Sequence, residues 1–177
     1  MVMNKCTDEF EVCCKSDEFN KCDTYAECVY RAFYDKNDGK YPHQRHITKD
    51  TLNEYKQNLL EIENEFKKCV NFDEIYELFK KHRIYGIGDL TIYDVALRVS
   101  QNYGIYPDKL YLHAGTRVGA FKAGLIPKYS RKHVLSPADF PEEFDWLRGV
   151  EPYLIEDFLC IYKDDVNEKN LKIFLQK

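Results

Sequence analysis

Residues 72–99 read FDEIYELFKKHRIYGIGDLTIYDVALRV, and this stretch sets the fold class of the chain. Apolar side chains recur at helical spacing on both sides of two glycines, Gly86 and Gly88. The first apolar stripe is Phe72, Ile75, Tyr76 and Phe79, and the second is Ile92, Val95, Ala96 and Val99. Asn71, with Glu74 three residues later, matches the capping box that opens a helix. The stretch therefore predicts a helix, a tight turn and a second helix.

The two glycines predict a turn whose backbone comes close to a partner. Glycine permits positive φ angles that other residues avoid, and at Gly88 we expect a conformation that only glycine tolerates well. The N–H groups that follow Gly88 belong to the first turn of the second helix, where they have no acceptor within the helix. Such groups, together with the helix dipole, favour a phosphate.

This pattern resembles the helix-hairpin-helix motif of DNA-repair and DNA-processing proteins. The residues that carry the resemblance are Ile84, Gly86, Ile87, Gly88, Ile92 and Val95. Ile92 departs from the motif, which usually has a small residue such as Ala at that position. The resemblance implies binding to the backbone of DNA or RNA. The alternative is an ordinary helical corner in which the glycines only turn the chain.

A weaker similarity extends to the core of base-excision DNA glycosylases, which carry the same motif. In that family a signature with a catalytic Asp follows the hairpin, and LYLH at residues 110–113 stands in the corresponding region. Tyr111 occupies the position of the Asp, and Leu90 that of the Lys found in bifunctional members. The resemblance therefore implies a glycosylase-like core without its chemistry, and we expect no catalytic residue.

Charge is distributed unevenly along the chain. The net charge is −4, yet the segment from Lys80 to Lys132 holds ten Lys or Arg and three Asp or Glu, a local net charge of +7. A basic segment within an acidic protein indicates a polyanionic partner. The alternative is a basic face that docks on the protein's own acidic parts.

The hairpin and the basic segment together predict a nucleic-acid interface. We expect it to contain Lys81, Arg83, Gly86, Gly88, Thr91, His113, Thr116, Arg117 and Lys122. His113 also fits a histidine satisfied within the core. The loop YPHQRHI at residues 41–47 fits either a phosphate clamp, half of a metal site or an exposed polar loop.

The remaining patterns predict one helical domain. Cysteines crowd residues 1–22, which we separate from a single domain over residues 23–177. We expect an all-α fold of about six to eight helices with no strand. One long helix should run from Thr48 to Cys69, a short one from Pro107 to His113, and another from Thr116 to a stop at Gly124.

Several classes of protein are not favoured. No apolar run is long enough for a transmembrane helix, and the start of the chain has no secretory signal. No cysteine spacing fits a zinc site, so we expect neither metal nor cofactor. These features predict a cytoplasmic monomer with reduced thiols.

We therefore expect a non-enzymatic protein that binds DNA or RNA backbone through the hairpin. The alternative from another class is a helical domain for protein–protein interaction or for structure. A third hypothesis is an enzyme that acts on a phosphorylated small molecule through His113, Arg117 and the loop at residues 41–47.

Overall fold

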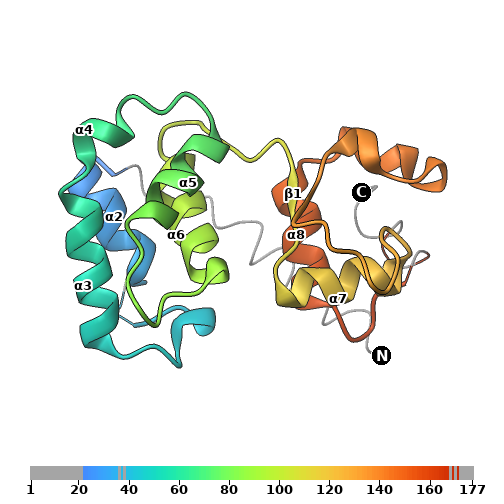
Figure 1. Cartoon of the computed structure of the whole chain (residues 1–177), viewed down its shortest axis with the longest axis horizontal. Helices are drawn as coiled ribbons and strands as arrows, with labels where there is room; N and C mark the ends of the chain where they lie inside the picture. Colours follow the sequence, from blue (N-terminus) through green and yellow to red (C-terminus); the bar gives the residue numbers. More distant parts are fainter. Residues whose placement is uncertain (1–21, 36, 38, 168, 170, 172–177) are drawn as a thin grey trace. The chain divides into compact units, whose positions relative to one another are not determined.

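The computed structural model describes residues 22–35, 37, 39–167, 169 and 171 (Figure 1). The chain groups into two compact units, which we describe separately. The N-terminal unit ends at Pro107, and the C-terminal unit begins at Asp108. That residues 23–177 act as a single domain stays a prediction. The predicted cysteine-rich segment lies outside the described residues except for Cys22.

The N-terminal unit is a cluster of helices. Its elements are α2 (Tyr25–Phe33), η2 (Pro42–Gln44), α3 (Lys49–Leu60), α4 (Glu63–Phe66), α5 (Phe72–Lys81) and α6 (Asp89–Gln101). Helix α6 packs against α2 and α5, and α2 also packs against α3 (Figure 1). Every residue of the two apolar stripes predicted for α5 and α6 is buried. The predicted helix, turn and helix are therefore confirmed as local structure.

Side-chain caps explain where these helices begin. Thr24, Thr48 and Asn71 each accept a backbone N–H at the start of α2, α3 and α5. At α5 the Asn71 side chain accepts the Glu74 N–H at 2.9 Å. The Glu74 carboxylate in turn accepts the N–H of Val70, one residue earlier than a standard capping box requires.

The predicted helix from Thr48 to Cys69 is wrong in its length. The structure divides it into α3 and α4, because the N–H of Ile62 bonds to the carbonyl of Leu59 and tightens the turn. Leu59, Ile62 and Phe66 nevertheless stay buried. The apolar spacing therefore identified the buried positions correctly but did not reveal the break.

The C-terminal unit combines helices with a small sheet. Its elements are β1 (Leu110–Tyr111), α7 (Ala114–Ala123), β2 (Val134–Leu135), η3 (Pro137–Asp139), η4 (Glu142–Gly149) and α8 (Pro152–Ile161). Helix α7 packs on α8, and β1 also lies against α8. The core includes Leu110, Ala120, Leu135, Phe144, Leu147, Ile155, Phe158 and Leu159.

Two predictions for this unit are wrong. We expected no strand and a helix from Pro107 to His113, but Leu110 pairs with Leu135 and Tyr111 with Val134 in an antiparallel ladder. Strands of two residues are too short for alternation to reveal them. Helix α7 starts at Ala114, two residues before its predicted start, and ends as predicted at Gly124, whose φ is 91°.

The all-α fold class is confirmed, since the described residues contain seven α-helices and one two-stranded sheet. Within the described part of the chain, none of the helices has the length and apolar character needed to cross a membrane.

Candidate nucleic-acid interface

The connection between α5 and α6 contains a tight turn built on Gly86. The N–H of Ile87 donates to the carbonyl of Ile84 at 3.2 Å, and Gly86 has a φ of 89°. This positive φ at the third residue is typical of a type II turn, where glycine is strongly favoured. Ile87 is buried, so it fixes the turn to the core, whereas Tyr85 is fully exposed at the tip.

Gly88 has a different conformation from the one expected. Its φ of −91° lies in the extended region that any residue adopts, so the prediction of a conformation that only glycine tolerates well is wrong here. Gly88 is the N-cap of α6, and a Cβ added there would have no heavy atom within 4 Å. The first intrahelical bond runs from Ile92 N–H to the Gly88 carbonyl. The N–H groups of residues 89–91, in the first turn of α6, therefore have no acceptor within the helix.

The predicted cations of the hairpin lie beside carboxylates. The Lys81 ammonium is 3.6 Å from the Glu65 carboxylate, and the Arg83 guanidinium is 3.3 Å from that of Asp89. All four side chains are largely exposed, so each pair stabilises the fold by about 1 kcal/mol or less.

Two side chains near the turn have structural roles. Thr91 lies in the first turn of α6 and is buried, so its side chain is not available on the surface of the turn. A Cβ on Gly86 would meet the methyl group of Thr51 at 3.4 Å, which places the turn against the first turn of α3.

The four predicted residues of the C-terminal unit are engaged within that unit. His113 is a buried N-cap of α7 whose ring stacks on that of Tyr111, with centroids 6.2 Å apart. The Thr116 hydroxyl donates to the buried carboxylate of Glu156 on α8. The Lys122 ammonium donates to the backbone carbonyl of Asp164 and lies 3.6 Å from its carboxylate.

Arg117 organises a loop. Its guanidinium donates to the carbonyls of Ser130 at 2.8 Å and Lys132 at 2.6 Å, and also to that of Leu112. These contacts bring the start of α7 and the segment before β2 together. The nine predicted residues thus fall into two groups, with Lys81, Arg83, Gly86, Gly88 and Thr91 in one unit and the rest in the other.

The segment that Arg117 holds is a strongly basic surface loop that the predicted site residues did not include. We call residues 127–133 the basic loop. Its exposed side chains include Lys128, Tyr129, Arg131, Lys132 and His133. The sequence carries a signal for it, since residues 109–138 contain six Lys or Arg and no Asp or Glu.

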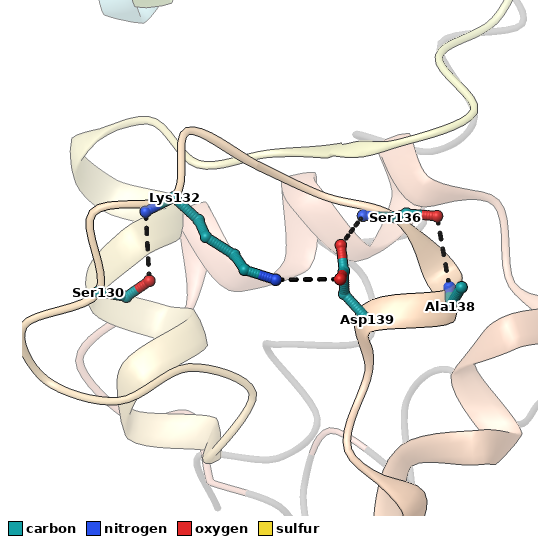
Figure 2. A network of polar contacts seen from close by, with 5 residues as sticks. All are labelled: Ser130, Lys132, Ser136, Ala138 and Asp139. Atoms are coloured by element: carbon teal, nitrogen blue, oxygen red, sulfur yellow. Dashed lines mark hydrogen bonds and ion pairs between the residues drawn. The ribbon is translucent and has the colours of Figure 1, made fainter.

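The far end of the basic loop is fixed by a polar network around Asp139 (Figure 2). The Lys132 ammonium lies 3.0 Å from one carboxylate oxygen of Asp139, and the other oxygen accepts the N–H of Ser136. The hydrogen bond from Lys132 lowers the pKa of the Asp139 carboxyl. The Lys132 N–H also donates to the Ser130 hydroxyl, so the loop backbone is restrained beside its charges.

The remaining residues considered for catalysis or metal binding are Tyr111 and the polar side chains of residues 41–47. Tyr111, which the glycosylase resemblance would place at the position of the catalytic Asp, is buried in β1. In the predicted loop at residues 41–47, Gln44 is buried in η2, while His43, Arg45 and His46 are exposed. No three His, Cys, Asp or Glu side chains come together as a possible metal site in the part of the chain that the structure describes.

Comparison with known proteins gives no relative from which a function could be transferred. No family model matches the chain, and no curated protein or solved structure matches it significantly.

Proposed function

We propose that this protein is a monomeric cytoplasmic binder of the DNA or RNA phosphate backbone, and that the turn between α5 and α6 is its contact surface. The proposal rests mainly on the open space around the Cβ position of Gly88, the N-cap of a helix whose first N–H groups have no acceptor within the helix. A helix N-terminus with free N–H groups and no covering side chain favours an anion. The resemblance of the turn to the helix-hairpin-helix motif supports the same ligand.

Electrostatics both support and limit this function. The segment from Lys80 to Lys132 has a net charge of +7, which attracts a polyanion. Asp89 opposes it, because its carboxylate lies in the first turn of α6 and competes with a phosphate for the helix dipole. Its partner Arg83 reduces that repulsion.

A second candidate function is a helical protein–protein interaction or structural domain. The observation in its favour is that the turn serves the fold: Ile87 is buried and Gly86 lies against Thr51 of α3. In this case the glycines turn the chain, and residues 89–91 need no ligand.

The two functions differ in how charge at the start of α6 affects nucleic-acid binding. Gly88→Asp and Gly88→Asn both provide good N-cap residues of nearly equal shape, so both variants should fold. Only Gly88→Asp adds a negative charge where a phosphate would lie. We expect it to bind a short duplex at least about tenfold more weakly than Gly88→Asn, or ~1.4 kcal/mol, by fluorescence anisotropy. Asp89→Asn removes a negative charge at the same place and should strengthen binding.

The dependence of binding affinity on salt concentration provides a second test of the two functions. Four to six phosphate contacts give a log–log slope of affinity against salt of about −4 to −5. Binding that does not depend on salt, or equal affinities for Gly88→Asp and Gly88→Asn, would favour the protein-interaction function.

A further inference from the structure

The backbone of the basic loop is held in place before any ligand arrives. Arg117 donates to the carbonyls of Ser130 and Lys132, and the Leu112 N–H donates to the His133 carbonyl at 2.8 Å. The Ser130 N–H bonds to the Pro127 carbonyl, which closes a turn around Tyr129. A loop restrained in this way loses little conformational freedom on binding.

The basic side chains of this loop are exposed to solvent, and only some of their positive charge is balanced by a nearby carboxylate. Lys132 is paired with Asp139. Lys128 and Arg131 are exposed, and neither forms an ion pair with another described residue. No Asp or Glu lies between residues 109 and 138, so among the described residues these two cations have no carboxylate partner.

Tyr129 stands between these two cations and is 84% exposed. The Lys128 ammonium lies 5.6 Å from the centre of its ring, a cation–π distance. An aromatic ring among basic side chains is the combination that binds single-stranded nucleic acid, since bases stack on the ring and phosphates pair with the cations. The bases of a duplex are less available for stacking on this ring, because they already stack on one another.

An anionic membrane also attracts basic loops, but the composition of this one favours nucleic acid. Membrane-surface segments insert several apolar side chains below the headgroups. From Lys128 to His133 the sequence is KYSRKH, in which Tyr129 is the single large apolar side chain.

We propose that the basic loop binds unpaired nucleic acid, with a base stacked on Tyr129 and phosphates held by Lys128 and Arg131. This site lies in the C-terminal unit and uses no residue of the hairpin. The inference deepens the proposed function and rests on it for the class of partner. DNA and RNA share the chemistry required, so both are tested.

The test uses the full chain and fluorescence anisotropy with labelled oligo(dT), oligo(U) and a mixed-sequence duplex. Tyr129→Ala should weaken binding to the preferred single strand about tenfold, or ~1.4 kcal/mol. Tyr129→Phe keeps the ring and should bind like the parent, and the duplex should be affected less than about threefold by either variant. A Tyr129→Ala variant that binds both single strands like the parent would overturn the proposal.

A charge-matched pair of double variants tests the cations. Lys128→Ala with Arg131→Ala should reduce the salt slope for single strands by about 1 to 1.5, because two phosphate contacts are lost. Lys68→Ala with Lys163→Ala removes the same charge elsewhere and should leave the slope unchanged. Equal slopes in the two double variants would overturn the assignment of phosphates to the basic loop.

The outcomes separate this site from the hairpin and from a membrane. An effect of Tyr129→Ala on single strands, with Gly88→Asp equal to Gly88→Asn, supports the loop and contradicts the hairpin. The reverse pattern contradicts the loop alone. Loop-dependent binding to vesicles of phosphatidylserine and phosphatidylcholine in equal parts, without an effect on oligonucleotides, would identify a membrane ligand and overturn the inference.

Discussion

Gly86 and Gly88 lie two residues apart and differ in how much strain an added side chain would cause. Gly86 has a φ of 89° and faces the Thr51 methyl group, whereas Gly88 has a φ of −91° and open space around its missing Cβ. Only Gly86 needs glycine for conformational reasons. At Gly88 neither the backbone conformation nor neighbouring atoms require glycine.

The difference predicts opposite effects on stability. Gly86→Ala should lower the free energy of unfolding by roughly 1–2 kcal/mol, because alanine is strained at positive φ. Gly88→Ser should raise it by a few tenths of a kcal/mol, since serine is at least as good an N-cap as glycine. Urea denaturation followed by circular dichroism measures both. Equal losses at the two positions would mean that the turn constrains Gly88 as well.

At the scale of secondary structure, α7 and α8 approach each other through two glycines of α7. A Cβ on Gly115 would lie 2.9 Å from the Cys160 Sγ, and one on Gly119 would overlap the backbone carbonyl of Leu159. A flexible side chain can move away from Gly115, but the backbone of α8 cannot easily move away from Gly119. The spacing of four residues places both glycines on one face of α7.

Gly119→Ala should therefore destabilise the C-terminal unit by about 3 kcal/mol, although alanine favours a helix. Gly149→Ala is the matched control, because no heavy atom lies within 4 Å of its added Cβ and its φ is not positive. We expect the control to change stability by less than about 0.5 kcal/mol. Thermal unfolding monitored by the fluorescence of Trp146 compares the two. Similar melting temperatures would show that α8 can shift to admit the methyl group.

At the scale of the whole molecule, buried tyrosines make the fold sensitive to alkaline pH. The Tyr25 hydroxyl donates to the Leu59 carbonyl and that of Tyr55 to the Phe79 carbonyl. Burial raises the pKa of both phenols above the ordinary value of 10.0, and raises those of Tyr76 and the Cys28 thiol to about 12. The folded state therefore binds these protons more tightly than the unfolded state does.

The sign of the effect follows from linkage. Since these pKa values are raised on folding, their contribution to stability is complete below about pH 9 and is lost as the pH rises through about 12. We expect a constant melting temperature from pH 7 to about 9 and a fall above that. Tyr55→Phe should cost ~1 kcal/mol at neutral pH through its lost hydrogen bond, but its alkaline fall should be smaller. A fall equal to that of the parent would exclude Tyr55 as a contributor.

Local signals account for what could be predicted correctly. Asn71 begins α5 through its own side chain, and Gly124 ends α7 through its positive φ. The apolar stripes of α5 and α6 are buried because helical spacing places them on one face. In each case the interaction involves residues within one or two turns of the chain.

Contacts between residues far apart in the sequence account for the features that could not be predicted. Leu110 becomes a strand because it pairs with Leu135, and the break after α3 gives no recognisable signal in the sequence. Arg117 counts as a positive charge in the sequence, but its guanidinium is used by the carbonyls of the basic loop.

The helical class, the turn between α5 and α6 and the basic character of residues 80–132 follow from the order of the amino acids alone. The folded structure was needed to show which glycine has a positive φ, which cations are already paired and which tyrosines are exposed. Helix propensity and turn chemistry act over a few residues and can be read along the chain. The availability of a charge or a ring depends on neighbours that only folding brings within a few ångströms.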